Sequence, residues 1–315
     1  MQDDLLRLRK DSDACEAELA RATSVLDTIR IADQRGAAVP LEELEAVYQS
    51  LADDFPEEYK LFDVASIALR QVLPMFKAAM APWDPIVAPA EPWLPAITAW
   101  KRLLGAKGHV IAHVDGDSQG GGDPFAELLL AVLFDPLRRC IMGRWDPKQP
   151  EGILRFFDGW IPIMPRGVSA HLLASLVMPR LRQSTNLWDP LSDPIPSHAW
   201  LHPWLPYLSD EMKDLYPMVR GKLASALQMW QGWDVSAHEV LKPWHRVWEK
   251  RDWDVLLGRC IVPPLKHAMH TVLNLNPLEK DDRPCEWVMT WSDIMPLHHL
   301  ASIYEEAFFP KLHQV

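Results

Sequence analysis

The chain has 315 residues, of which 48% are hydrophobic and 24% charged, with a formal net charge of −11 and a pI near 5.5. This length and apolar content allow a large buried core, so the composition excludes a mainly disordered chain. The acidic balance, without a dense run of Lys or Arg, disfavours direct binding to a nucleic-acid backbone, because such binding needs clustered cations that neutralise phosphates.

The cysteines and the hydropathy pattern bear on the compartment. The four cysteines are far apart and form neither a CxxC pair nor a disulfide-dense pattern, which fits a reducing compartment. The first ten residues lack the apolar segment of a signal peptide, and no later run reaches the roughly 18 apolar residues of a membrane span. We therefore expect a soluble protein of the cytoplasm or nucleus.

The first predicted element is a charged helix near residues 3–33, within an N-terminal segment over residues 1–38. Gly36 and Pro40 punctuate the chain after this helix. Its apolar or small positions step by threes and fours, which predicts a narrow seam packed on a neighbour or in a coiled coil. These positions are Leu8, Cys15, Leu19, Ala22, Leu26 and Ile29.

Residues 39–315 are expected to form one domain, which opens with a second helix. In "PLEELEAVYQSLADDF" helical spacing resumes at Leu41, and acidic residues occupy the first turn, where the helix dipole favours them. In the rest of the domain strand-like alternation is scarce and Pro is abundant, so an extended sheet is not expected.

Beyond residue 60 two short patterns alternate. One is an apolar pair followed by Pro and another apolar residue nearby, at Pro74, Pro136, Pro179, Pro217, Pro263 and Pro310. The other combines Trp and Pro, in "EPWLPAI" (91–97), "DGWIPIM" (158–164), "HAWLHPWLPYL" (198–208), "LKPWHRVW" (241–248) and "WSDIMPL" (291–297). The recurrence indicates an internal repeat.

The spacing of these patterns sets the repeat length. Nine positions separate Pro74 from Trp83, and the same offset recurs twice, each time ending in a "WDP" tripeptide. We call the six prolines of the first pattern the Pro landmarks. When the Gly-rich segment 105–123, which we expect to be a flexible loop, is left out of the count, successive Pro landmarks lie roughly 40–47 residues apart. This is the size of a two-helix HEAT or armadillo unit. We predict an all-α fold, a superhelical array of helix pairs in irregular repeats with Pro- and Trp-rich corners.

Pro and Trp have distinct expected roles at these corners. Asp-Pro steps such as Asp84-Pro85 are expected to start helices, and Pro within an apolar run should kink a helix or begin a new one. A buried Trp removes about 150–250 Å² from water, worth roughly 4–6 kcal/mol before opposing terms. We interpret five Trp as core residues rather than as a row that grips a peptide: Trp93, Trp160, Trp204, Trp244 and Trp291.

The acidic segment "DDFPE" resembles the motif with which helical terpenoid synthases hold magnesium and a diphosphate. Its carboxylates belong to Asp53, Asp54 and Glu57. The Asn/Asp, Ser, Glu motif that accompanies it in that family is not found, and Pro56 breaks the helix on which the carboxylates should share a face. An acidic helix end is the better interpretation, with a magnesium-dependent helical enzyme as the minor alternative.

The segment "DGDSQGGGDPFAE" begins like a calcium-binding loop. Asp115, Asp117 and Gly120 occupy positions 1, 3 and 6. Position 12, which needs a bidentate Glu, is Ala126, and Glu127 follows one residue late. The pattern favours a surface loop over a calcium site.

Three histidine pairs are candidate metal ligands: His198 and His202, His267 and His270, and His298 and His299. None has a third ligand at a recognisable spacing, so capping or partly buried histidines are expected instead. The sequence also lacks a P-loop, a dinucleotide-binding GxGxxG, a GxSxG elbow and an HExxH helix. We therefore predict no catalytic, cofactor or metal site.

From about Val39 onward the chain resembles the tuftelin-interacting, G-patch-containing spliceosome disassembly factors, in the region called the GC-rich-sequence DNA-binding-factor-like domain. The match rests on "FPEEYKLF" (55–62), "RWDPKQPEGILRFFDGWIPIMP" (144–165), "WDPLSDPIPSHAWLHPWLPYL" (188–208), "LYPMVRGKLASALQMW" (215–230), "DVSAHEVLKPWHRVW" (234–248), "CEWVMTW" (285–291) and "FFPKL" (308–312). The segments cover most of the chain, in order.

The resemblance implies a non-enzymatic nuclear scaffold in pre-mRNA splicing, with spliceosomal proteins as partners. Members of this family recruit and activate a DEAH-box RNA helicase that dismantles the intron-lariat spliceosome, through a G-patch upstream of this domain. The dense Gly cluster Gly120–Gly122 lacks the G-patch pattern. We therefore expect the chain to be the C-terminal part of a longer protein that does not activate the helicase alone.

A sister branch with the same domain gives the alternative function, a transcription-linked adaptor. The acidic balance favours protein partners over duplex DNA in that case too.

Overall fold

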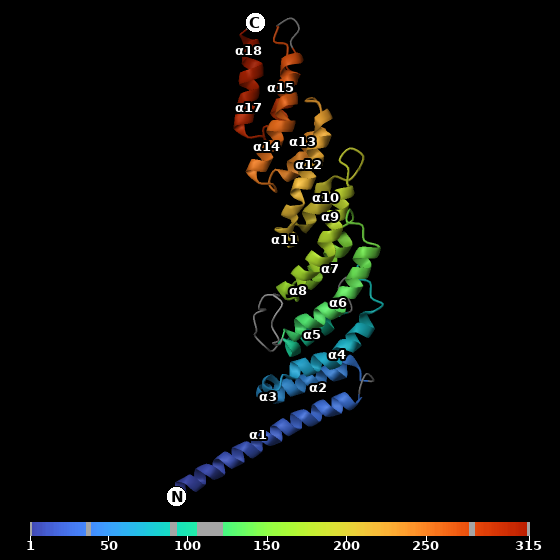
Figure 1. Cartoon of the computed structure of the whole chain (residues 1–315), viewed down its shortest axis with the longest axis vertical. Coiled ribbons are helices and arrows are strands. Elements are labelled where there is room, and N and C mark those ends of the chain that lie inside the picture. The colour runs from blue at the N-terminus through green and yellow to red at the C-terminus, as the bar shows by residue number, and fades with distance from the viewer. Residues whose placement is uncertain (1, 36–38, 89–92, 106–121, 277–280, 314–315) are drawn as a thin grey trace. The chain divides into compact units, whose positions relative to one another are not determined.

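The computed structural model describes residues 2–35, 39–88, 93–105, 122–276 and 281–313 (Figure 1). These residues form helices, and no strand occurs among them apart from one isolated bridge between Asn274 and Asp281. The prediction of an all-α chain is confirmed. In the described part, every helix is too short or too polar to cross a membrane.

The chain divides into two compact units. The first contains Met1–Asp146 with Glu151–Val177, and the second contains Pro147–Pro150 with Met178–Val315. The division into compact units falls near residue 177, and the long first helix belongs to the first unit. The expected segments 1–38 and 39–315 stay a prediction.

The first unit is built from eight described α-helices followed by a π-helical turn. They are α1 (Gln2–Arg35), α2 (Leu41–Asp54), α3 (Pro56–Leu61), α4 (Val64–Met80), α5 (Trp93–Leu104), α6 (Pro124–Gly143), α7 (Glu151–Trp160), α8 (Arg166–Leu172) and η2 (Leu173–Val177). The helices predicted over 3–33 and from Leu41 are present. α4 and α6 pack against each other and carry much of the core of this unit.

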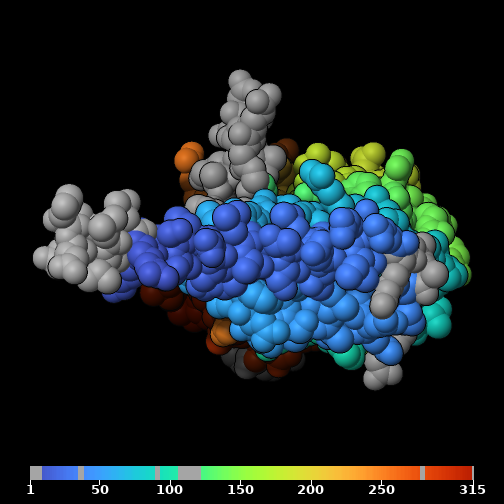
Figure 2. Space-filling view, turned by 90° about the horizontal axis from the view of Figure 1, so that it is seen from below, coloured from blue at the N-terminus to red at the C-terminus, as the bar shows by residue number. Residues whose placement is uncertain are grey.

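Helix α1 lies along α2 and α3 (Figures 1 and 2). Its buried residues are Val25, Ile29 and Ala32, whereas Leu19 and Leu26 are exposed. In the predicted seam Ile29 is buried and Ala22 partly buried, whereas Cys15, Leu19 and Leu26 are exposed, because the face that meets α2 and α3 is rotated from the seam. The side chains of α1 that are described as buried all lie in its C-terminal half.

The second unit is built from shorter helices. They are α9 (Met178–Leu187), α10 (Ser197–Leu201), η3 (His202–Trp204), α11 (Leu205–Leu208), η4 (Glu211–Asp214), α12 (Tyr216–Ala226), η5 (Leu227–Met229), α13 (Ser236–Leu241), η6 (Lys242–Trp244), α14 (Lys250–Cys260), α15 (Val262–Thr271), α16 (Arg283–Thr290), α17 (Leu297–Ile303), η7 (Tyr304–Phe308) and α18 (Phe309–Leu312). Two of the 3-10 turns, η3 and η6, have the same x-Pro-Trp sequence.

The Pro landmarks occur in both predicted settings. Pro74 and Pro136 lie inside α4 and α6, whereas Pro217 and Pro263 lie in the first turns of α12 and α15. A first turn tolerates Pro because its amide has no partner within the helix.

The other two landmarks come after π-helical turns. Pro179 comes two residues after η2, and Pro310 comes two residues after η7. Because Pro lacks an N–H and its ring clashes with the carbonyl four residues earlier, a widened turn just before it accommodates the ring within a continuing helical path.

The Asp-Pro steps of the "WDP" tripeptides do not start helices, which corrects the prediction made for them, whereas Asp123-Pro124 does start α6. At Asp84-Pro85 and Asp189-Pro190 the chain enters a turn, and no helix begins there. Each Asp side chain accepts a hydrogen bond from the amide two residues later, at 3.0 Å from Ile86 N and 3.2 Å from Leu191 N. This local bond stabilises a turn in competition with the helix.

The Trp of each step closes the same turn from the other side. The Trp83 indole donates to the Ala88 carbonyl at 2.7 Å, and the Trp188 indole donates to the Ile195 carbonyl at 3.1 Å. "WDP" is therefore a loop-closing unit: the Trp is buried while its polar edge is satisfied by the backbone it encloses.

Candidate functional site

The five Trp proposed as core residues differ in burial. Trp160, Trp204 and Trp244 have no exposed surface, and Trp291 is 2% exposed. Trp93, the first residue of α5, is only partly buried, so it is not a core residue of the same kind.

Aromatic neighbours surround the buried Trp. Trp160 stacks on Phe156 with ring centroids 5.5 Å apart, and Trp244 stacks on Trp248 at 4.9 Å. The Trp291 ring meets the Trp230 ring edge to face at 5.6 Å. These Trp are parts of packed cores and not a surface row that could grip a peptide.

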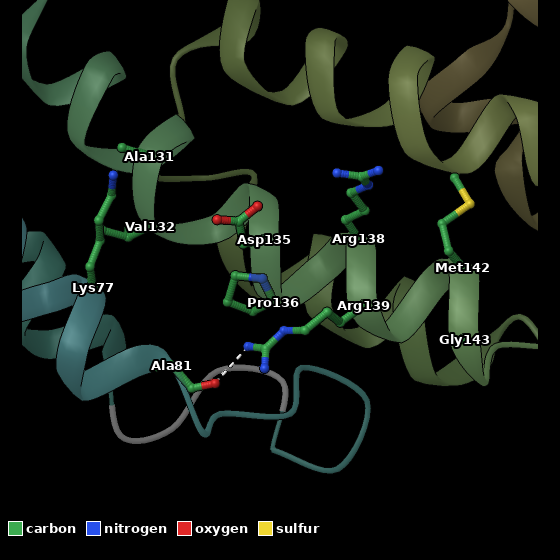
Figure 3. A pocket seen from close by; sticks show the side chains of 10 residues that line it. All are labelled: Lys77, Ala81, Ala131, Val132, Asp135, Pro136, Arg138, Arg139, Met142 and Gly143. Atoms are coloured by element: carbon green, nitrogen blue, oxygen red, sulfur yellow. Dashed lines mark hydrogen bonds between the residues drawn. The ribbon is translucent and has the colours of Figure 1, made fainter.

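An open concavity lies within the first unit, between α4 and α6, and we call it the α4–α6 groove (Figure 3). Its volume is about 680 Å³, and it is open to solvent. Its lining residues are Lys77, Ala81, Ala131, Val132, Asp135, Pro136, Arg138, Arg139, Met142 and Gly143. Its volume lies in the range of small-molecule sites, but its openness to solvent also suits a chain segment bound along the surface.

The internal prolines of the two helices shape this groove. Pro136 is buried within α6 and lines the groove, and Pro74 lies one turn before Lys77 on α4. Pro inside a helix removes one backbone hydrogen bond and bends the axis.

The groove carries more positive than negative charge. Lys77, Arg138 and Arg139 contribute three cations, and Asp135 contributes one anion. Arg139 turns to donate to the Ala81 carbonyl at 2.6 Å, whereas Lys77 and Arg138 point to the same side and have no ion-pair partner among the described residues (Figure 3). Met142, 45% exposed, adds an apolar side chain. A locally basic, partly apolar groove on a chain of net charge −11 suits an acidic segment with apolar residues.

The acidic segment "DDFPE" spans a break between helices. α2 ends at Asp54 and α3 begins at Pro56, as the sequence predicts, and Asp53, Asp54 and Glu57 are exposed. The Gln49 side chain donates to Asp53 at 2.6 Å. The three carboxylates lie on two helix ends instead of one helix face, which is unsuited to holding magnesium together with a diphosphate.

Only the end of the calcium-loop pattern is described. Asp115, Asp117 and Gly120 lie outside the described residues, as does most of segment 105–123. Ala126 and Glu127 belong to the first turn of α6, whose N-cap Asp123 accepts from Phe125 N at 3.0 Å. The last ligand positions of a calcium loop therefore fall within a capped helix.

His198 and His202 are partly buried next to aromatic rings. The His202 ring meets the Trp244 ring edge to face, with centroids 4.6 Å apart. Burial, with a smaller contribution from the nearby His198, lowers the pKa of His202 to about 4, and burial also lowers the pKa of His198. Both imidazoles are consequently neutral packing groups at physiological pH.

The other two histidine pairs differ from each other. His267 and His270 are exposed on α15, and no third ligand joins them among the described residues. His298 and His299, at the start of α17, meet Asp254 of α14. Sequence spacing could not reveal this third residue, because Asp254 and His299 are 45 positions apart.

The α4–α6 groove was also missed by sequence reasoning. Its charged residues do not form a motif, and they become neighbours only because α4 packs on α6. A weak signal was present in the cations of "DPLRRC" (135–140) beside an internal Pro.

Comparison with known proteins relates the chain to one family. The family model described as GC-rich sequence DNA-binding factor-like protein matches residues 41–315. The chain is 32% identical to tuftelin-interacting protein 11 of Bos taurus over 98% of its own length, and 29% identical to that of Danio rerio over 100%. It covers 37% and 38% of these two relatives, so it spans well under half of their length.

Proposed function

Because the chain belongs to the family of GC-rich sequence DNA-binding factor-like proteins, we propose that it is a non-enzymatic nuclear scaffold of pre-mRNA splicing. The observation that carries the proposal is its similarity, over nearly its whole length, to proteins named for an interaction with another protein. The scaffold supports disassembly of the intron-lariat spliceosome together with a DEAH-box RNA helicase. A G-patch elsewhere in such a protein activates the helicase, and this helical region docks spliceosomal proteins.

The α4–α6 groove is the docking surface in this proposal. Lys77 and Arg138 are exposed and have no ion-pair partner among the described residues, so an acidic partner gains charge pairs without breaking existing ones. Met142 and Ala131 supply apolar contact beside these charges. The occupant is an acidic segment of a spliceosomal protein that also carries apolar residues.

Affinity capture with charge-reversed bait tests the proposal. The chain is used to capture proteins from nuclear extract after nuclease treatment, and the bound proteins are identified by mass spectrometry. We expect late-spliceosome proteins with the wild-type bait and at least a roughly tenfold loss with the double variant Lys77→Glu and Arg138→Glu. Such charge contacts typically set association rate and specificity.

A matched control separates docking from net charge. Lys60→Glu with Arg155→Glu makes the same charge change at exposed positions of α3 and α7, and it should leave the captured set unchanged. Equal loss with both double variants would point to a general charge effect. Recovery of no splicing protein by the wild-type bait would contradict the scaffold function itself.

We also propose that the helix pairs form a superhelical repeat array. Support comes from the recurrence of local designs, namely the x-Pro-Trp turns at 202–204 and 242–244 and the "WDP" turns at Trp83 and Trp188. Small-angle X-ray scattering tests the array: a compact chain of 315 residues has a radius of gyration of about 20 Å, and an array should exceed this clearly. A measured value near 20 Å would exclude it.

A further inference from the structure

One cluster of metal-ligand side chains in the second unit is not used by the docking function. Asp254 of α14 (Lys250–Cys260) lies between two adjacent histidines of α17 (Leu297–Ile303). The Nε2 atoms of His298 and His299 are 2.9 Å and 3.0 Å from the same carboxylate atom, Oδ1 of Asp254. Three ligand atoms from two helices thus converge on one point.

The carboxylate atom at the centre of this cluster lacks a hydrogen bond. Asp254 Oδ1 is shielded from solvent, and the ring nitrogens of His298 and His299 contact it at ion-pair distance without the geometry of a hydrogen bond. His299 Nε2 instead forms its hydrogen bond with the backbone carbonyl of Asp254, at 3.3 Å. A shielded carboxylate oxygen normally has a partner, because leaving it without one costs free energy.

The two imidazoles and the carboxylate form a tight group. The ring centroids of His298 and His299 are 4.1 Å apart, and both Nε2 atoms lie within 3.0 Å of Asp254 Oδ1. Imidazole nitrogens and carboxylate oxygens are electron-pair donors with which proteins hold metal ions.

We propose that Asp254, His298 and His299 form a zinc-binding site that joins α14 to α17. Two imidazole nitrogens and one carboxylate oxygen are a donor set typical of Zn²⁺, whereas Mg²⁺ and Ca²⁺ prefer oxygen ligands. Ligand atoms about 2.0–2.2 Å from a tetrahedral zinc ion are about 3.3 Å apart, so small side-chain rotations would open the observed 2.9 Å and 3.0 Å separations enough.

The surroundings of the cluster favour this site. Gly258 lies one turn after Asp254 on α14, and a Cβ there would come within 3.0 Å of His299 Cε1. Glycine therefore leaves room for the His299 ring against the helix. The His298 side chain is 63% exposed and that of His299 only 15%, so one side of the cluster is open to a metal ion and to a water as fourth ligand.

The test is zinc binding to the metal-free chain. Isothermal titration calorimetry with ZnCl₂ should give one strong site in the wild-type chain. Asp254→Asn, which keeps the side-chain shape but removes the charge, should weaken that site by at least about tenfold. His267→Gln removes an exposed histidine of α15 and serves as the matched control, with wild-type binding expected.

Cobalt gives a readout of the coordination itself. Co²⁺ bound by two imidazoles, a carboxylate and a water in tetrahedral geometry should give strong visible absorption, which ZnCl₂ then removes by displacement. Gly258→Ala should weaken this signal by pushing the His299 ring away while leaving all three ligands in the sequence. Circular dichroism of each variant without metal confirms that it is folded.

Two results would overturn the proposal. One is zinc affinity of Asp254→Asn equal to that of the wild type and of His267→Gln, which would assign the binding to other histidines. The other is a Co²⁺ titration in which the wild-type chain shows only the weak visible absorption of six-coordinate Co²⁺.

Discussion

The two compact units build their cores from helices of different length. In the first unit α4 and α6 have 17 and 20 residues, whereas the longest described α-helices of the second unit, α12 and α14, have 11 each. Tryptophan is distributed in the opposite way, with five of the fifteen in the first unit and ten in the second. A short helix places few side chains in the core, so each must bury more surface, and Trp buries the most. Helix length and side-chain size thus compensate for each other.

Removing one buried indole from the second unit gives the largest expected effect. Trp204→Ala should lower the free energy of unfolding by about 3–5 kcal/mol, because a fully buried aromatic side chain leaves a cavity. Urea denaturation measures this change. Trp233→Ala, in the same unit but with 62% of the residue exposed, should change it by less than about 0.5 kcal/mol. Similar losses from both variants would break the comparison of the units.

The aromatic core of the second unit also predicts a loss of stability in acid. Burial holds the pKa of His202 near 4, below its ordinary 6.5, so the unfolded chain takes up a proton at a higher pH than the folded chain. The free energy of unfolding should fall as pH drops from 6.5 towards 4, by roughly 2 kcal/mol at pH 5.

Urea midpoints at pH 7.5 and pH 5 measure this dependence. His202→Gln should flatten it clearly, although His198, whose pKa is lowered by the same cause, keeps part of it. The exposed variant His267→Gln should follow the wild type. If the urea midpoint of His202→Gln changed with pH as much as that of the wild type, the His202 imidazole would be solvated in the folded state.

Two proline substitutions should have opposite signs and smaller effects. Pro74 is exposed inside α4, so Pro74→Ala restores a helix hydrogen bond and should stabilise the first unit by about 1 kcal/mol. Pro263 is exposed in the first turn of α15, where Pro fits, so Pro263→Ala should destabilise the second unit by about 0.4–1 kcal/mol. Thermal unfolding of both variants checks the signs. The same sign for both would show that the units do not differ in how they use Pro.

Local patterns predicted much of the fold. The charged first helix, the break at Pro56 and the two settings of the Pro landmarks follow from capping, spacing and the missing N–H of Pro. The buried face of α1 was missed because only packing on α2 and α3 selects Val25 over Leu26. The Asp-Pro steps were misinterpreted because the same Asp side chain can cap a helix or close a turn.

The candidate sites could not be predicted in the same way. Lys77 and Arg138 share a groove only through the packing of α4 on α6, and Asp254 meets His298 only through the packing that brings α14 to α17. Neither pair has a sequence spacing that a local rule could recognise. The burial of Trp204 and Trp244 can be predicted without knowing how the helices pack, because a large apolar side chain favours the interior in any fold.

The π turn η7 determines how this end of the chain tolerates insertions and deletions. A π turn holds one residue more than an α turn, so deleting one residue between Tyr304 and Phe308 would restore a regular helix. The wider turn absorbs this extra residue, so everything from Phe309 onward would keep its face relative to α17. Lys311, which donates to the Leu273 carbonyl, would keep its orientation toward that group. A one-residue gap here in an alignment of relatives would therefore mark the loss of the π turn, with no change of the helix face or of any loop length.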